Sequence, residues 1–416
     1  MKKFFVIVAV VLFILNFNFV FAGNNDWVKV ESGNNYNYLM AIQFVNANTG
    51  YIVGSGGLVL KTTNGGVSWT TKSSGISSDI HCVYFFDANT GLAAGNLGRI
   101  IRTTNGGDNW AQVQSPTTYT LINFSFVNSS VGYISGQTTT LLKTEDGGLT
   151  WVKKGVNESG PFVDCYFSNA TTGIALHYMY AIKKTTNSGV NWTSVYTLPG
   201  NIVLDDLCFK NYPTGVAVGD GGYIVKTTNG GDNWTLVQAN GQGYNLYDVC
   251  FFNETIGFAV GRTATSNSTG IIVKTGNRGD SWTTEANLPA GLNALTCSPS
   301  GYIWAVGDTG TIYRSINPVG IHNISTEVPG NYKLSQNYPN PFNPVTNIEF
   351  AIPKKSNVNL TVFDMTGKVI EVLVNSVLSA GSFKYDFNAS KLSSGTYFYR
   401  LQADGFSETK KMVLVK

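Results

Sequence analysis

The phrase Thr62-Thr63-Asn64-Gly65-Gly66-Val67-Ser68-Trp69 returns with small changes along most of the 416-residue chain. Its copies share the pattern Thr-x-Asn/Asp-x-Gly-x-x-Trp, and their tryptophans lie 41 to 48 residues apart. A seventh tryptophan near the N-terminus keeps the same phase; the set is Trp27, Trp69, Trp110, Trp151, Trp192, Trp234 and Trp282. Periodicity of this length indicates a fold built from repeated supersecondary units.

The repeated phrase has the composition of a tight hairpin, and we call it the hairpin lock. An Asn or Asp side chain can accept hydrogen bonds from nearby backbone N–H groups, and Gly permits the positive φ of a tight turn. The closing Trp then buries a large ring at the start of the next strand. We therefore expect the lock to join two strands and to anchor them in a core.

A second phrase precedes each lock and supplies three further strands. In the first repeat it is Phe44-x-Asn46-x-x-x-Gly50-Tyr51-Ile52-Val53-Gly54, followed by Leu58-Val59-Leu60-Lys61. With the strand after the Trp, each repeat of about 42 residues holds four strands, which is one blade of a β-propeller. The seventh repeat stops at Arg314 without a lock.

The strand missing from the seventh repeat is predicted at the other end of the chain, as Trp27-Val28-Lys29-Val30. Pairing the two ends would remove the open sheet edges. The sequence thus predicts an all-β protein with a seven-bladed β-propeller at residues 23–317. An open solenoid is the alternative.

Composition excludes several classes of function. Only 13% of residues are charged and the net charge is +3, which gives no electrostatic case for nucleic acid. The five cysteines and three histidines form no metal-ligand spacing, so we expect no metal and no cofactor, and interpret the cysteines as buried free thiols. Cys208 and Cys250 occupy the same position in neighbouring repeats and should point alike rather than at each other.

The first 22 residues have the pattern of a signal peptide. Lys2 and Lys3 precede an apolar run from Phe4 to Phe17, and Val20-Phe21-Ala22 suits cleavage after Ala22. A retained anchor helix is the alternative. No later stretch is apolar over the ~18 residues that a membrane span needs.

Composition changes after Asn317. Residues 318–331 read as a linker, and residues 332–416 as a small Ig-like β-sandwich. Within it, Asn337-Tyr-Pro-Asn-Pro-Phe-Asn-Pro344, Val362-Phe-Asp-Met-Thr-Gly-Lys368, Leu392-Ser-Ser-Gly-Thr-Tyr-Phe398 and the final Lys-Met-Val-Leu closely resemble the type A C-terminal sorting domain of the type IX secretion system. The resemblance implies Sec export, passage across the outer membrane by that machinery, and a secreted or cell-surface protein. A plain accessory domain is the alternative.

The propeller resembles a second family. Residues 91–110 and 215–234 best match the phrase Gly-x-Ala-x-Gly-x-x-Gly-x-Ile-x-Lys-Thr-Thr-Asn-Gly-Gly-x-x-Trp of the photosystem II assembly and stability factors, and the lock is similar to the Asp-box repeat of sialidases. In photosynthetic members the propeller is a chaperone-like binding module. The resemblance implies a propeller with binding character, and in an exported protein no role in photosynthesis.

Two groups of residues are candidate binding sites. The fourth repeat replaces its second Gly cluster with His177, Tyr178, Met179 and Tyr180, and we expect these to gather with Tyr244 and Tyr247 of an inter-blade loop around a sugar or a peptide. The alternative is that these aromatics only pack the ring. The sixth repeat carries about six extra residues around Arg262–Ser268, also predicted as a loop between its second and third strands.

The second group is Asp164, Asp206 and Asp248, each three residues before a repeated Phe. They should lie on the inner strands at the mouth of the central channel. Their repetition favours a structural role, such as capping the loop that enters the strand. An acidic mouth that binds a cation or ligand is the alternative, followed by catalysis.

The function expected from these features is a non-enzymatic binding module for an unknown protein or glycan, exported through its C-terminal domain. A secreted glycoside hydrolase is the alternative, since such enzymes need two carboxylates ~5–9.5 Å apart. A structural or adhesive role is also open.

Overall fold

A computed structural model describes residues 27–33, 37–155, 160–239, 241–264, 266–315, 320–325, 327–389 and 392–416. The expected signal peptide, residues 1–22, lies outside these ranges. Within them the chain is built of β-strands and turns, with four 3-10 turns: η1 (Ser55–Gly57), η2 (Asn96–Gly98), η3 (Asp220–Gly222) and η4 (Asp308–Gly310). The described residues contain no helix that is long and apolar enough to cross a membrane.

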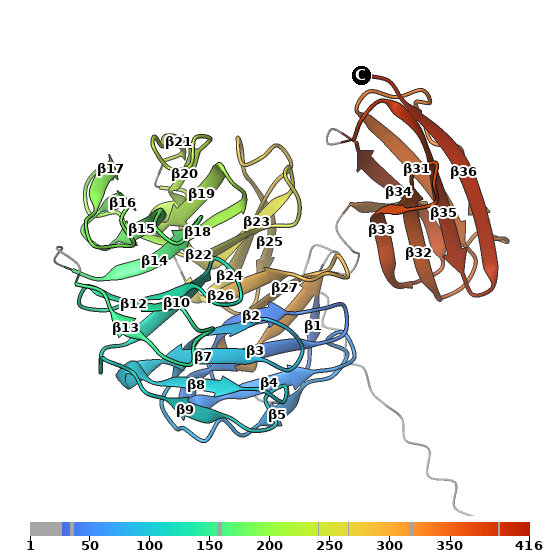
Figure 1. Cartoon of the computed structure of the whole chain (residues 1–416). Coiled ribbons are helices and arrows are strands. Elements are labelled where there is room, and N and C mark those ends of the chain that lie inside the picture. Colours follow the sequence, from blue (N-terminus) through green and yellow to red (C-terminus); the bar gives the residue numbers. More distant parts are fainter. Residues whose placement is uncertain are drawn as a thin grey trace, which may run out of the picture.

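Each of the first six repeats forms one antiparallel four-stranded sheet whose strands follow one another in the chain (Figure 1). The first three sheets are β2 (Leu39–Phe44), β3 (Gly50–Gly54), β4 (Val59–Thr62), β5 (Thr70–Lys72); β6 (Ile80–Phe85), β7 (Gly91–Gly95), β8 (Ile100–Thr103), β9 (Ala111–Val113); and β10 (Leu121–Phe126), β11 (Gly132–Gly136), β12 (Thr140–Thr144), β13 (Val152–Lys153). The next three are β14 (Phe162–Phe167), β15 (Gly173–His177), β16 (Ala181–Thr185), β17 (Thr193–Thr197); β18 (Leu204–Asn211), β19 (Thr214–Gly219), β20 (Ile224–Thr227), β21 (Thr235–Gln238); and β22 (Tyr244–Phe251), β23 (Gly257–Thr263), β24 (Ser266–Thr275), β25 (Thr283–Leu288).

The seventh sheet joins the two ends of the propeller. It consists of β26 (Leu292–Cys297), β27 (Ile303–Gly307), β28 (Ile312–Ser315) and, as its outermost strand, β1 (Trp27–Val30). β1 pairs antiparallel with β28, with Trp27 opposite Ser315. The first strand of each sheet contacts the first strand of the next, and β26 contacts β2. The seven sheets therefore form a closed ring, as predicted, and not an open solenoid.

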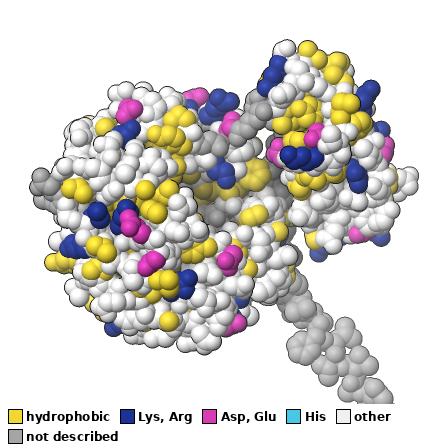
Figure 2. Space-filling model, viewed as in Figure 1, with side chains coloured by type: hydrophobic (Ala, Val, Ile, Leu, Met, Phe, Trp, Pro, Cys, Tyr) yellow, Lys and Arg dark blue, Asp and Glu magenta, His cyan; other side chains and the backbone are white. Residues whose placement is uncertain are grey.

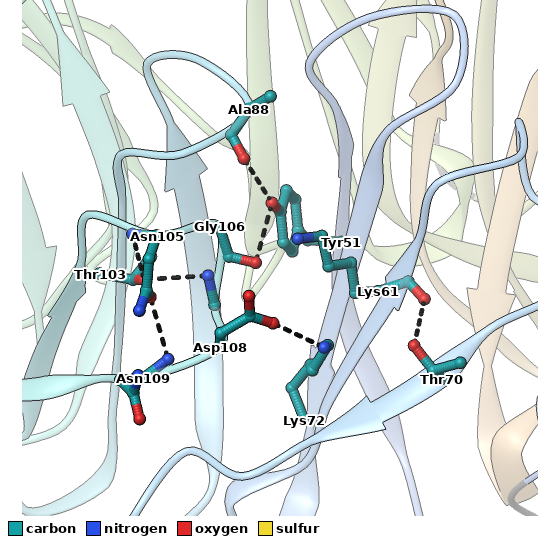
Figure 3. A network of polar contacts seen from close by, with 11 residues as sticks. Tyr51, Lys61, Thr70, Lys72, Ala88, Thr103, Asn105, Gly106, Asp108 and Asn109 are labelled. Atoms are coloured by element: carbon teal, nitrogen blue, oxygen red, sulfur yellow. Dashed lines mark hydrogen bonds and ion pairs between the residues drawn. The ribbon is translucent and has the colours of Figure 1, made fainter.

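The hairpin lock is held by its Thr and Asn side chains. Thr62 Oγ1 accepts a hydrogen bond from the N–H of Gly66 at 2.9 Å, and Asn64 Oδ1 accepts one from the N–H of Ser68 at 3.0 Å. Figure 3 shows the second copy, in which Asn105 Oδ1 accepts from the N–H of Asn109 at 3.0 Å. The repeated Thr and Asn thus satisfy backbone donors that a tight turn leaves unpaired.

The Trp of each lock packs on the Phe of its own repeat. The ring centroids of Phe44 and Trp69 are 5.8 Å apart at 78°, an edge-to-face contact that the other locks repeat. The same Phe ring covers the Gly at the start of the second strand, since a Cβ on Gly50 would lie 2.9 Å from Phe44. Phe, Gly and Trp therefore recur together because they form one packing unit.

Polar contacts tie each blade to the next. The Tyr51 hydroxyl donates to the carbonyl of Ala88 at 2.9 Å, and Lys72 forms an ion pair with Asp108 of the second lock at 2.6 Å (Figure 3). Equivalent lock carboxylates pair with lysines in two other blades, in Lys184–Asp232 and Lys226–Asp280.

On the face shown in Figure 2 the basic side chains are scattered and several lie beside acidic ones. The small positive net charge is therefore dispersed on that face.

The C-terminal module is a sandwich of two four-stranded sheets. One sheet has the order β29 (Ile321–Ser325), β34 (Gly381–Asn388), β31 (Val345–Ile352), β30 (Lys333–Leu334), and the other β33 (Val369–Leu378), β32 (Ser356–Phe363), β35 (Gly395–Ala403), β36 (Phe406–Leu414). Both sheets contribute to one core, which includes Phe350, Phe383 and Tyr399.

The segment expected as a linker, residues 318–331, contains one of these strands. β29 pairs with β34, with Ile321 opposite Tyr385, and the Ile321 side chain is buried in the sandwich core. The linker prediction is therefore wrong for Ile321–Ser325. Pro318, Pro329 and Gly330 suggested an extended connection, whereas the short run between them pairs with a neighbouring strand.

Candidate functional site at the channel mouth

All seven inner strands carry a β-bulge at the same repeat position. In β2 the pairing with β3 passes from Leu39 to Ala41, and the other inner strands skip the equivalent residue. The skipped residues, which we call the bulge ring, are Met40, His81, Ile122, Val163, Asp205, Tyr247 and Asn293. All seven line one cavity of about 480 Å³ in the propeller, the channel-mouth cavity. A bulge turns side chains out of the regular alternation, so this shared bulge builds the cavity wall.

The residues that follow the bulges form a second ring in the same cavity. They are Ala41, Cys82, Asn123, Asp164, Asp206, Asp248 and Ala294. The structure thus places the three predicted aspartates together, on neighbouring inner strands and at equivalent positions. The fourth to sixth blades contribute the acidic residues, and the first blade contributes the apolar Met40, Ala41 and Ile42.

Each of these aspartates links its inner strand to the next blade. Asp164 Oδ2 accepts from the N–H of Leu207 at 3.0 Å, and Asp206 Oδ2 accepts from that of Val249 at 2.9 Å. Asp248 Oδ2 likewise accepts from the N–H of Leu295 at 2.7 Å. The carboxylates thus act between strands of adjacent blades, where the sequence suggested a cap on their own entering loops.

The carboxyl groups also lie next to one another in a row. Asn123 Nδ2 donates to Asp164 Oδ1 at 2.5 Å, Asp164 contacts Asp206, and Asp206 contacts Asp248. Burial and then the charge of Asp206 raise the pKa of Asp164 well above its usual value. Burial and then the charge of Asp248 do the same to the pKa of Asp206, and burial raises the pKa of Asp248 to about 6. The row therefore keeps its protons to a higher pH than exposed carboxyl groups do.

This row predicts an unusual pH dependence of stability. Unfolded carboxyl groups release their protons near pH 4, whereas native Asp248 keeps its proton until about pH 6. The native state therefore binds more protons in this window, and the free energy of unfolding falls as the pH rises. From pH 5 to pH 8 we expect a loss of about 1 kcal/mol from Asp248 alone. Urea denaturation at both pH values measures it.

The control for this prediction is in the sorting module. Hydrogen bonds from Thr366 lower the pKa of the exposed Asp364, so its contribution is complete above pH 4. Asp364→Asn should leave the difference between pH 5 and pH 8 unchanged, whereas Asp248→Asn should reduce it. A parent protein that becomes more stable from pH 5 to pH 8 would contradict the raised pKa of Asp248.

Two charged residues of the cavity were not predicted as site residues. Asp205 Oδ2 is buried without a hydrogen-bond partner among the described residues, and burial and then Asp220 raise the pKa of its carboxyl group well above the usual value. Arg262 binds Asp308 at 2.6 Å and Asn293 at 2.5 Å. The Arg262 Nε atom has no hydrogen-bond partner in the described part of the chain.

Arg262 reaches the cavity because the sixth blade is longer than the others. The extra residues extend its strands, so that Asn245 pairs with Arg262 and Arg262 with Gly270. The expected loop around Arg262 is therefore largely strand. Tyr244 and Tyr247 also lie on β22, the inner strand of this blade, and not on an inter-blade loop.

The predicted aromatic cluster is divided in the structure. His177 is buried at the end of β15 against Phe162, with ring centroids 5.5 Å apart. Tyr178 is 51% exposed and its ring lies 6.5 Å from that of Tyr180. Of the aromatic candidates only Tyr247 lines the channel-mouth cavity. Tyr244 instead accepts a hydrogen bond from Gln238 at 3.0 Å between the fifth and sixth blades.

The described residues contain no group of three or more His, Cys, Asp or Glu side chains arranged to hold a metal ion. The cavity offers acceptor oxygens, the phenol rings of Tyr38 and Tyr247, and the paired guanidinium of Arg262.

Comparison with known families establishes the role of the C-terminal module. Residues 336–416 match the secretion system C-terminal sorting domain family. The C-terminal module is a secretion sorting domain. The protein is therefore handled by the type IX secretion system and is secreted or displayed on the cell surface.

The propeller matches another family. Residues 21–117 and 109–204 match the photosynthesis system II assembly factor YCF48 family. The propeller of this exported protein thus resembles that family in sequence over its N-terminal part. No curated protein matches the chain.

Solved structures agree with this fold. A structure of YCF48 bound to a D1 peptide has a TM-score of 0.58 and 17% identity, covering 70% of this chain and 97% of that one. YCF48 from Cyanidioschyzon merolae has a TM-score of 0.57 and 17% identity, covering 70% of this chain and 98% of that one. A GH74 xyloglucanase from Xanthomonas campestris has a TM-score of 0.57 and 12% identity, covering 78% of this chain and 59% of that one. At these identities the likeness is one of fold.

Proposed function

We propose that this exported propeller is a non-enzymatic binding module that takes a polypeptide ligand into its channel-mouth cavity. The observation that carries the proposal is the cavity itself, which all seven inner strands line and which holds a buried, unpartnered carboxylate oxygen on Asp205. A cavity that combines an apolar wall with a few convergent polar groups is the usual form of a binding site.

The charges of the cavity favour a ligand with a basic side chain. Four aspartates line it, namely Asp164, Asp205, Asp206 and Asp248. Arg262 is the one Lys or Arg among its described lining residues, and its guanidinium is already paired with Asp308. An ammonium or guanidinium group entering the cavity would pair with carboxyl groups that have no cationic partner among the described residues, and would favour their ionised form.

The rim of the cavity favours a polypeptide over a free small cation. Tyr38 lines the cavity and is 48% exposed. A second pocket, next to the second blade, is lined by Leu97 and Tyr119, whose side chains are 64% and 45% exposed. His81 of the cavity is hydrogen-bonded to Asn96 of that pocket at 2.9 Å. Exposed apolar groups next to an acidic cavity suit a chain that carries apolar and basic residues together.

One structural feature supports binding without turnover, and one similarity supports a peptide ligand. The three ring aspartates are held by backbone N–H groups of the next blade, so none is placed as an independent general acid. A similar propeller has been solved with a peptide bound.

The test compares two surfaces of the propeller. Mature protein from residue 23 is screened against an array of basic and acetylated peptides and against a polysaccharide panel, and affinities of the hits are measured by fluorescence anisotropy. Asp205→Asn removes a charge without removing a hydrogen bond of Oδ2, and should weaken binding about tenfold or more, the effect of one charged contact. Tyr178→Ala, on the fourth blade outside the cavity, is the matched control and should leave the affinity within about twofold.

Other outcomes would reject parts of the proposal. Loss of binding in Tyr178→Ala with no change in Asp205→Asn would place the ligand on the turn of the fourth blade. Release of reducing sugar from any polysaccharide would show a glycoside hydrolase instead of a binding module. Equal affinity for acetylated and unmodified peptides would show that binding does not depend on a basic side chain of the ligand.

A further inference from the structure

A repeated contact between neighbouring inner strands lies further along the channel than the aspartates. Gln43 Oε1 accepts from the N–H of Phe85 at 2.6 Å, and Ser125 Oγ accepts from that of Phe167 at 2.9 Å. In each case a side chain of one inner strand meets the repeated Phe of the next blade. The contact therefore brings together the residue before the Phe in one blade and the Phe position of the following blade.

Cysteines occupy this contact in the last blades. The N–H of Phe251 is hydrogen-bonded to Cys208, as expected from the repeat. The following contact involves Cys250 and Cys297, because Cys297 pairs with Ile303 at the register where Phe251 pairs with Gly257 in the sixth blade. The two cysteines lie on the neighbouring inner strands β22 and β26, are both partly exposed, and border the same apolar cluster between the sixth and seventh blades.

We infer that Cys250 and Cys297 are a redox pair that forms a disulfide between the sixth and seventh blades after export. The five cysteines are free thiols in the structure, and this pair occupies the position at which Ser125 of one inner strand meets Phe167 of the next. The sorting domain sends the protein out of the cytoplasm, away from the reducing systems that keep thiols reduced there. Position and compartment together favour oxidation of this pair.

The reaction is thiol–disulfide exchange with a low-molecular-weight disulfide. The thiolate of one cysteine attacks that disulfide, which forms a mixed disulfide and releases one small thiol. The second cysteine thiolate then attacks the bound protein sulfur and releases the other small thiol. The protein loses two electrons and two protons, and the oxidant gains both as two thiols.

Burial and contact with Cys297 raise the pKa of the Cys250 thiol well above its usual value, and nearby Cys208 and Asp248 act in the same direction. Only the thiolate reacts, so the folded protein should be oxidised slowly at neutral pH and faster at higher pH. The disulfide would close a loop of residues 250–297 and hold β26 against β22. The disulfide would stabilise the seventh blade, in which Cys297 replaces the Phe ring that packs in the other six blades.

The test is chemical and uses the full mature chain. After incubation with oxidised glutathione at pH 8.5, the thiols titrated in denaturant should fall from five to three. Trypsin should release residues 227–262 and 279–314 as one linked species, which reduction separates. The melting temperature should rise by roughly 5–10 °C, since the link restricts the unfolded chain.

Variants separate the pair from the third cysteine. Cys208→Ser should keep the link and the shift, whereas Cys250→Ser should lose both. Cys297→Phe restores the repeat consensus and should also lose the link, while remaining folded without oxidant. Five reactive thiols after prolonged oxidation, or a link that involves Cys208 in place of Cys297, would overturn the inference.

Discussion

Replacing Gly66 by Ala is expected to destabilise the propeller by about 2–4 kcal/mol, with about 1 kcal/mol from the backbone and about 1–3 kcal/mol from overpacking. Gly66 has φ +80°, and a Cβ there would lie 2.2 Å from the Cη2 atom of Trp304. Trp304 is fully buried in the seventh blade, so its ring cannot move aside. Urea denaturation followed by tryptophan fluorescence measures the change in the free energy of unfolding.

Gly75 provides the matched control for this variant. Its φ is +74° and a Cβ there would meet nothing within 4 Å. Gly75→Ala therefore imposes the backbone cost of about 1 kcal/mol without the clash. If Gly66→Ala and Gly75→Ala proved equally stable, the first lock would not be seated against the seventh blade.

Removing the closing strand should have the second large effect. A chain that begins at Glu31 lacks β1, exposes the edge of β28 and removes the buried Trp27 ring. Loss of a buried Trp ring alone costs roughly 3–5 kcal/mol. An open sheet edge also pairs readily with other chains. We expect a lower melting temperature and self-association, measured by thermal melting and by light scattering after size exclusion.

Two further chains separate the parts of this effect. A chain that begins at Trp27 keeps β1 and should behave as the mature protein does. Trp27→Ala in the mature protein keeps the strand pairing and should lower stability without self-association. A monomer of unchanged stability that begins at Glu31 would show that β1 does not close the ring.

The repeat made the propeller predictable because one packing unit recurs at one spacing. The Phe, Gly and Trp of each repeat contact one another, so their spacing in the sequence reports a geometry that all blades share. The closing role of Trp27–Val30 followed from the same phase. Sequence resemblance likewise identified the sorting domain, because its motifs span the whole module.

The candidate site was only partly predictable, for physical reasons. Asp164, Asp206 and Asp248 share a repeat position, and the sequence placed them correctly on the channel. The bulge before them cannot be recognised from the order of apolar and polar residues, so the sequence did not predict that Asp205 lines the cavity. Arg262 depended on an extension of β22 and β23 that an insertion of unknown conformation does not reveal.

The central claim is that a ligand occupies the channel-mouth cavity, and a cavity-filling variant tests it most directly. Ala41 lines the cavity from the first blade, whereas the aspartates come from the fourth to sixth blades. Ala41→Trp should therefore block entry without altering any charge, and Tyr178→Trp places the same new side chain outside the cavity. The measurement is the affinity of each variant for the peptide that the mature protein selects, after melting curves have shown both to be folded. We predict a loss of more than about tenfold for Ala41→Trp, a cost of at least about 1.4 kcal/mol, with Tyr178→Trp unchanged; equal affinity in the two variants would contradict the account.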